Sequence, residues 1–162
     1  MRRWPTTGRA EQRSGELGDW TTWLLLGGRG SGKTRVGSEW VQSIVSGDPL
    51  HTNTKVGRLA LVGETYGDVR DVMIEGESGI LAVGAGAERP VWTPSRRKLE
   101  WPNGALAHVY SSEDPDALRG PQFEAAWCDE LAKWSNMRET WDMLQFALRL
   151  GDRPRQVVTT TP

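Results

Sequence analysis

The sequence predicts an α/β fold with a mainly parallel sheet, and three observations support this prediction. Short apolar runs alternate along the chain with segments of helical periodicity, a pattern typical of parallel strands joined by helices. One apolar run is followed by a glycine-rich loop and a helix, which is the order of a phosphate-binding unit. The length of 162 residues suits one domain with a substantial core.

Composition narrows the function classes. The formal net charge of −1 argues against a protein that coats DNA by charge alone, although it leaves room for a local basic groove. The single cysteine, Cys128, excludes a disulfide framework and a cysteine-rich zinc site. No apolar run reaches transmembrane length, so we expect a soluble, cytoplasmic protein without a membrane partner. The nine tryptophans are scattered, which favours packing in the core and at its rim over stacking on nucleic-acid bases.

Residues 1–19 are expected to form an irregular arm because they show little periodicity. Four arginines make this arm basic, and Gln12 lies shortly before the first predicted strand. Two interpretations stay open. The arm is either a solvated tail or a segment that folds over an adenine base, with Gln12 contacting the edge of that base.

A phosphate-binding motif, G-x-x-x-x-G-K-[ST], lies at residues 27–34. In order, its residues are Gly27, Gly28, Arg29, Gly30, Ser31, Gly32, Lys33 and Thr34. Glycines let the backbone curl tightly around an anion so that successive N–H groups point inward. Lys33 can then reach the β- and γ-phosphates and assist catalysis, and the Thr34 hydroxyl can ligate Mg²⁺. The motif therefore predicts nucleotide binding, with ATP and Mg²⁺ as the expected ligands.

The segments around the motif have the order that it requires. Residues 23–26 form a short apolar run that predicts a buried parallel strand. Residues 36–45 carry apolar side chains at helical spacing, and Gly47 is expected to end this helix. Residues 58–63 predict a second buried strand, and a short helix is expected over 68–74.

A hairpin and a further helix are predicted in the second half of the chain. The hairpin covers residues 97–110, where Asn103-Gly104 is a favoured pair for a two-residue turn. Asn136 is suited to cap the following helix, and Gly151 is expected to end it.

A buried strand over 123–128 ends in Asp129-Glu130, and this pair carries the expected chemistry. An acidic residue at the end of such a strand holds the water shell of Mg²⁺ in P-loop enzymes. A second carboxylate beside it can orient and deprotonate an attacking water molecule. A hydrolase needs such a base, whereas a metabolite kinase must exclude water, so the pair favours hydrolysis.

Arg29 and Arg119 are candidates for stabilising charge on a transferred phosphoryl group. Arg29 lies inside the loop. Arg119 lies in a polar segment and is either a surface arginine or a residue that faces a neighbouring subunit.

A last strand, over 155–160, should lie beside the strand that precedes the phosphate-binding loop. It ends in three threonines, which are Thr159, Thr160 and Thr161. Their hydroxyls could sense the γ-phosphate and relay its presence, although threonines are also common in strands.

Several stretches together resemble one known family, and they span residues 18–162. The stretches are 18–35 around the motif, 101–104 (WPNG), 113–121 (EDP running to LRGP), 127–134 (WCDELAKW) and 159–162 (TTTP). They resemble the N-terminal ATPase domain of the large terminase subunit, the DNA-packaging motor of tailed phages and prophages. This combination is far more specific than the phosphate-binding motif alone.

The resemblance implies a P-loop NTPase of the additional-strand, RecA-like (ASCE) type, with the threonine strand beside the P-loop strand. It implies that Asp129 holds the metal, that Glu130 is the catalytic base and that the three threonines couple hydrolysis to movement. Arg29 and Arg35 would lie among the nucleotide-binding residues, and Arg119 would reach the nucleotide of a neighbouring subunit.

The resemblance also implies partners. These are double-stranded DNA, a portal protein, a small terminase subunit and further copies of the chain in a homo-oligomeric ring, at the procapsid portal in the bacterial host cytoplasm. Whole large terminases continue into a nuclease domain, whereas this chain ends at Pro162, so we assign 20–162 to the ATPase domain and expect no nuclease activity. Two other functions stay open: a helicase-like or recombinase-like DNA-dependent ATPase, and a truncated nucleotide-binding module that does not hydrolyse.

Overall fold

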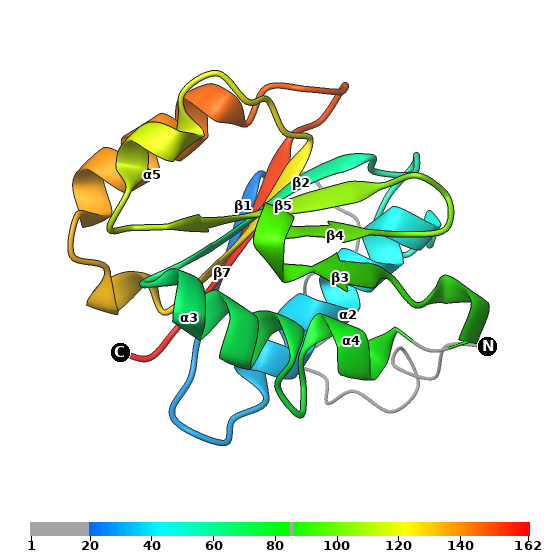
Figure 1. Cartoon of the computed structure of the whole chain (residues 1–162), viewed down its shortest axis with the longest axis horizontal. Coiled ribbons are helices and arrows are strands. Elements are labelled where there is room, and N and C mark those ends of the chain that lie inside the picture. The colour runs from blue at the N-terminus through cyan, green and yellow to red at the C-terminus, as the bar shows by residue number, and fades with distance from the viewer. Residues whose placement is uncertain (1–19, 85) are drawn as a thin grey trace.

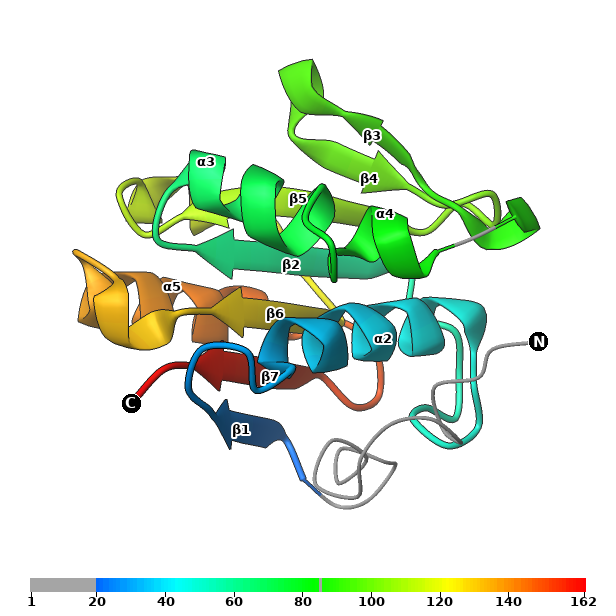
Figure 2. The ribbon, with the colours of Figure 1, turned by 90° about the horizontal axis from the view of Figure 1, so that it is seen from below.

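The structure, a computed structural model, describes residues 20–84 and 86–162, so the arm with Gln12 lies outside the described residues. Figures 1 and 2 show one sheet with helices on both of its faces. Its seven strands are β1 (Thr22–Leu26), β2 (Arg58–Gly63), β3 (Val91–Thr93), β4 (Lys98–Glu100), β5 (Leu106–Ser111), β6 (Ala125–Asp129) and β7 (Arg155–Thr160). Their order across the sheet is β1-β7-β6-β2-β5-β4-β3.

The sheet is mainly parallel, as predicted. All pairs from β1 to β5 in this order are parallel, and β4 and β3 extend the sheet as antiparallel strands. The threonine strand, β7, pairs with β1, which confirms its predicted place beside the P-loop strand. Because parallel strands deliver their carboxyl ends to one edge, the ends of β1, β2, β6 and β7 lie together.

Helices and short turns complete the fold. The helices are α2 (Lys33–Ser46), α3 (Tyr66–Asp68), α4 (Ile80–Val83) and α5 (Met137–Ala147), and a wide π-type turn, η2 (Val69–Ile74), continues α3. The 3₁₀ turns are η3 (Gly86–Glu88), η4 (Pro94–Arg96), η5 (Pro115–Leu118) and η6 (Leu131–Lys133). Helices α2, α3 and α4 cover one face of the sheet and α5 the other (Figure 2). Among the described helices, none has the length and apolar character needed to cross a membrane.

The core consists of two hydrophobic clusters, one on each face of the sheet. The central strand β2 shows how they arise, because Leu59 and Leu61 belong to the cluster with α2, and Ala60 and Val62 to the cluster with α5. Successive strand residues point to opposite faces, so a central strand needs apolar side chains throughout. The predicted buried strand over 58–63 is confirmed. The tryptophans that the structure describes all belong to these clusters or pack against them, as expected.

β1 is an edge strand, and the prediction that residues 23–26 are buried is wrong for two of them. Leu24 and Leu26 are 53% and 56% exposed, whereas Trp23 and Leu25 are partly buried. Within the described part of the chain, β1 pairs with β7 alone. An apolar run has the same composition at the edge of a sheet as at its centre, so composition does not distinguish the two positions.

The predicted hairpin is present as β4 and β5, but its connection differs from the prediction. Residues 101–105 join the two strands, instead of a two-residue turn at Asn103-Gly104. Asn103 Nδ2 donates to Val45 O at 3.0 Å, which ties this loop to the last turn of α2. The connection still contains a local turn, in which Gly104 N donates to Trp101 O at 2.9 Å and Gly104 has a left-handed φ of 91°.

α5 shows a similar departure at each end. Asn136 occupies the N-cap position, yet its side chain donates to Ser112 O at 3.0 Å and does not cap the helix. The helix ends at Ala147, before Gly151, and Leu148 then forms an isolated parallel bridge with Phe123.

Candidate nucleotide-binding site

The predicted phosphate-binding loop connects the carboxyl end of β1 to the first turn of α2. Gly30 and Gly32 have φ angles of 76° and 87°, a left-handed conformation that residues with a Cβ rarely adopt. Gly27 N donates to Thr160 O at 3.1 Å, so the loop is also attached to the end of β7. α2 starts at Lys33, directly after Gly32, which places the positive end of its dipole at the loop.

A hollow of about 310 Å³ lies beside this loop, at the carboxyl ends of the parallel strands. The predicted site residues that line it are Arg29, Lys33, Thr34, Asp129, Glu130 and Thr161. They come from the loop, α2, the end of β6 and the end of β7, and the sheet brings them together. Asp68 and Lys133 also line the hollow. Neither was predicted: Asp68 ends the short helix α3 and Lys133 ends the turn η6, and the sequence does not fix the direction of either element.

Glu130 is held by two neighbours in this hollow. Its Oε1 lies 3.3 Å from Lys33 Nζ and accepts from Thr161 Oγ1 at 3.1 Å, and its Oε2 accepts from the Thr161 amide at 3.3 Å. Its φ of 52° is left-handed, which is uncommon for a residue other than glycine, and residues with such strained backbone cluster at functional sites. Burial raises the pKa of Glu130, but the Thr161 hydrogen bonds and the Lys33 ammonium outweigh burial and leave the pKa below its ordinary value. The carboxylate is therefore ionised at neutral pH and can accept a proton.

Asp129 ends β6 and is only 6% exposed. Its Oδ1 accepts from Thr159 Oγ1 at 2.7 Å. Burial raises the pKa of Asp129 to about 6, and the charge of Glu130 acts in the same direction, against the lowering effects of Thr159 and Lys33. A buried carboxylate in this position gains from a bound cation, because the cation compensates its charge.

The residues of the hollow fit Mg²⁺. This ion prefers oxygen ligands and usually takes one or two carboxylates together with phosphate oxygens and water. Thr34 offers a hydroxyl and Asp129 a carboxylate to the same hollow. Across residues 20–84 and 86–162, no group of three or more His, Cys, Asp or Glu side chains could hold a metal. The residues therefore suit a metal that is bound together with nucleotide phosphates.

The three threonines at the end of β7 make different contacts. Thr159 donates to Asp129, and Thr161 donates to Glu130. Thr160 Oγ1 instead accepts from Ala132 N at 3.1 Å, so it anchors the turn η6. The end of β7 thus holds both carboxylates, and the coupling role of the threonines stays a prediction.

Comparison with known protein families shows which family the chain belongs to. Residues 24–162 match the family described as terminase large subunit, T4likevirus-type, N-terminal. The chain belongs to the large terminase subunit family. The match includes the phosphate-binding loop, both carboxylates and the three threonines of this terminase domain.

Solved structures of phage large terminases share the fold. The ATPase domain of the Thermus phage P74-26 large terminase aligns with a TM-score of 0.52 at 17% identity, over 88% of this chain and 59% of that chain. The large terminase of a thermophilic bacteriophage in complex with ADP gives a TM-score of 0.64 at 15% identity, over 86% of this chain and 33% of that chain. The large terminase of bacteriophage HK97 gives a TM-score of 0.61 at 16% identity, over 86% of this chain and 29% of that chain.

The fold class predicted for this terminase domain is confirmed. β7 lies between β1 and β6, which is the additional-strand order of P-loop NTPases of the ASCE type, and the similar structures are terminases of that type.

The arginines predicted at the terminase site lie in different places. Arg29 lines the hollow, whereas Arg35 pairs with Glu39 one turn along α2 at 2.8 Å and does not line it. Arg119 is exposed, and its Nε donates to Asp116 Oδ1 at 3.1 Å. It lies beside Phe146 in a separate surface hollow. The structure therefore does not bring Arg119 to the hollow beside the phosphate-binding loop of its own chain, and its action on a neighbouring subunit stays a prediction.

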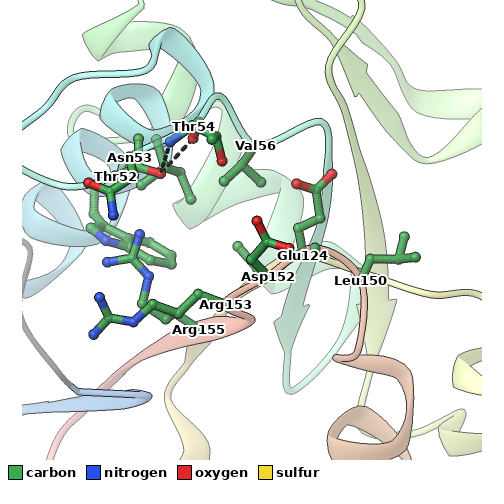
Figure 3. A pocket seen from close by; sticks show the side chains of 13 residues that line it. Thr52, Asn53, Thr54, Val56, Glu124, Leu150, Asp152, Arg153 and Arg155 are labelled. Atoms are coloured by element: carbon green, nitrogen blue, oxygen red, sulfur yellow. Dashed lines mark hydrogen bonds between the residues drawn. The ribbon is translucent and has the colours of Figure 1, made fainter.

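Another hollow of the terminase domain lies at the opposite, amino ends of β2, β6 and β7 (Figure 3). Its volume is about 110 Å³, and its lining carries both signs of charge, with Glu124 and Asp152 opposed to Arg153 and Arg155. Arg155 is buried and its Nη2 donates to His51 O at 2.6 Å. Burial, together with the charge of Arg153, lowers the pKa of Arg155. The hollow contains none of the predicted site residues.

Proposed function

We propose that this domain hydrolyses ATP with Mg²⁺ and couples hydrolysis to the movement of double-stranded DNA into a procapsid. One observation carries the proposal: Lys33, Asp129 and Glu130 converge on one hollow beside a phosphate-binding loop. A structural relative is described in complex with ADP, which supports an adenine nucleotide. Membership of the large terminase family supports DNA packaging as the purpose of hydrolysis.

The side chains have separate parts in the proposed reaction. The loop amides and Lys33 bind the β- and γ-phosphates and neutralise the charge that develops on them. Glu130 accepts a proton from a water molecule whose oxygen attacks the γ-phosphorus, while the bond from that phosphorus to the bridging oxygen of ADP breaks. Mg²⁺, held by Asp129 and Thr34, supplies further charge neutralisation when it is bound. Arg29 adds a positive charge at the edge of the loop.

The packaging activity requires partners as well. We propose that copies of the chain form a ring at the portal in the host cytoplasm, with a small terminase subunit delivering the DNA. In such a ring, Arg119 of one copy would act on the nucleotide of the next. Thr161 joins Glu130 to β7, and we propose that this contact relays the state of the nucleotide to the rest of the domain.

The test is a comparison of ATP turnover and ATP binding in Glu130→Gln, with and without duplex DNA. Because a general base contributes about 10²- to 10⁴-fold to the rate, turnover should fall at least about 100-fold. Binding of a fluorescent ATP analogue should stay within about threefold of the unsubstituted protein, because the base acts mainly in the transition state. Glu139→Gln makes the same chemical change at an exposed position on α5 and serves as the control.

Two outcomes would contradict parts of the proposal. Equal losses of binding and turnover in Glu130→Gln would refute its assignment as the catalytic base. Tight binding of Mg-ATP without turnover in the unsubstituted protein, even with DNA and partners supplied, would favour a nucleotide-binding module over an ATPase.

A further inference from the structure

We infer that Trp127 is a positioning residue for the carboxylate of Asp129 and that it acts through the hydroxyl of Thr159. The inference rests on the proposed function, in which Asp129 holds Mg²⁺. It goes beyond that function because the tryptophan lies in the core of the sheet and does not line the nucleotide hollow.

A short chain of hydrogen bonds connects the three side chains. Trp127 Nε1 donates to Thr159 Oγ1 at 2.8 Å, and Thr159 Oγ1 lies 2.7 Å from Asp129 Oδ1. Trp127 and Thr159 are completely buried, so water does not compete for either bond. The sheet register places these groups together, because Asp129 of β6 is paired with Thr159 of β7.

The chemistry of the three side chains decides which group donates and which accepts in each of these hydrogen bonds. An indole N–H can only donate, so the Thr159 oxygen must accept from Trp127. The single hydroxyl proton of Thr159 is then left for another acceptor. Asp129 Oδ1 at 2.7 Å is a better acceptor than Cys128 O at 3.5 Å, because it is nearer and charged. One carboxylate oxygen is therefore engaged in a fixed direction, and the other would remain to ligate Mg²⁺.

The ring of Trp127 also contacts the helix that carries the second proposed metal residue. A Cβ at Gly37 would lie only 2.1 Å from Trp127 Cε2, so the backbone of α2 rests directly on the indole. Gly37 lies one turn after Thr34, near the start of α2. The packing of α2 against the ring therefore holds the indole in place and fixes the direction in which its N–H donates to Thr159.

The chain offers a matched control for a purely structural role. Trp40 is also a buried core tryptophan, but its Nε1 has no hydrogen-bond partner among residues 20–84 and 86–162. Trp127→Phe and Trp40→Phe therefore remove similar amounts of ring from the core, and only Trp127→Phe removes a hydrogen bond. Thr159→Val and Thr159→Ser form a second pair, in which only the valine lacks the hydroxyl.

The experiment measures the Mg²⁺ concentration that gives half-maximal binding of a fluorescent, non-hydrolysable ATP analogue, and the binding of the same analogue in EDTA. Loss of an outer-shell partner typically lowers metal affinity about 10- to 100-fold, so we expect Trp127→Phe and Thr159→Val to raise the midpoint at least about tenfold. Trp40→Phe and Thr159→Ser should stay within about twofold of the unsubstituted protein. Binding of the analogue in EDTA should be unchanged in all four variants, because the hydrogen bonds position a ligand of Mg²⁺ and EDTA removes that ion.

The double variant Trp127→Phe/Thr159→Val should be no worse than Thr159→Val alone, since the two residues act in series. Additive effects, or a midpoint in Trp127→Phe equal to that in Trp40→Phe, would overturn the inference while leaving the proposed function intact. Analogue binding that is absent, or independent of Mg²⁺, in the unsubstituted protein would instead overturn the proposed function. If Trp127→Phe does not fold, the threonine pair alone decides, because Thr159→Val with an unchanged midpoint refutes the inference.

Discussion

Replacing Gly37 by alanine should destabilise the domain, although alanine is the better helix former. A Cβ at position 37 would lie 2.1 Å from Cε2, 2.3 Å from Cζ2 and 2.4 Å from Nε1 of Trp127. Carbon atoms in favourable contact are about 3.5 Å apart or more, so the nearest approach falls short by about 1.4 Å. Trp127 is fully buried and hydrogen-bonded, so it cannot move aside freely. α2 would have to shift away from the sheet.

The expected magnitude is a net loss of about 2 kcal/mol in the free energy of unfolding. Overpacking a close-packed core costs about 1–3 kcal/mol, and the size of this overlap favours the upper end of that range. Alanine recovers up to about 1 kcal/mol of intrinsic helix stability relative to glycine. The steric cost therefore outweighs the gain in helix propensity.

Urea unfolding followed by far-ultraviolet circular dichroism measures this loss. Gly67→Ala is the control, because a Cβ at that position of α3 would meet its nearest neighbour, Thr65 Oγ1, at 3.7 Å. The control should be as stable as the unsubstituted protein or slightly more stable. If Gly37→Ala matched or exceeded the stability of that control, the proposed clash between the Cβ and Trp127 would be refuted.

Two further predictions concern the carboxylates. Because the pKa of Asp129 is raised from 3.8 to about 6, this carboxylate binds more protons in the folded protein than in the unfolded chain between these values. The contribution of Asp129 to stability is therefore complete below the lower value and falls by about 3 kcal/mol as the pH rises through the higher one. Urea titrations across this window should show the fall in the unsubstituted protein and a shallower slope in Asp129→Asn, and equal slopes would contradict the assignment. Thr161→Val removes the hydroxyl that donates to Glu130 Oε1 at 3.1 Å but keeps the amide bond, so turnover should fall about tenfold while ATP affinity changes less than about twofold. A larger loss of affinity than of turnover would show that Thr161 serves binding instead.

Local sequence patterns were sufficient to predict the structure of segments whose conformation depends on their own residues alone. The glycine spacing before Lys33 requires left-handed backbone, and the structure has it at Gly30 and Gly32. The strand ends were also predictable, because consecutive parallel strands bring their carboxyl ends to one edge, and this rule placed Asp129 and Glu130 beside the loop.

The features of the fold and the site that the sequence did not predict depend on contacts between segments that are distant along the chain. Asn103 has the chemistry of a tight turn and Asn136 that of a cap, but each side chain donates to a carbonyl far along the sequence. The role inferred for Trp127 has the same origin, because its partner Thr159 is 32 residues away and becomes adjacent only through the register of β6 and β7. Composition identified the tryptophans as core residues and carried no information about where an indole N–H would point.

The carboxyl end of β7 is attached to both halves of the candidate site. Thr160 O accepts from the amide of Gly27 in the loop, and Thr161 holds the carboxylate of Glu130. A mechanical load on this strand would therefore change the distances at the loop and at the base together. Linkage is reciprocal for binding free energies, so a pull on β7 that weakens nucleotide affinity implies that nucleotide binding resists that pull by the same free energy. In the proposed motor, β7 would serve as the common point at which load on the DNA and occupancy of the site oppose one another.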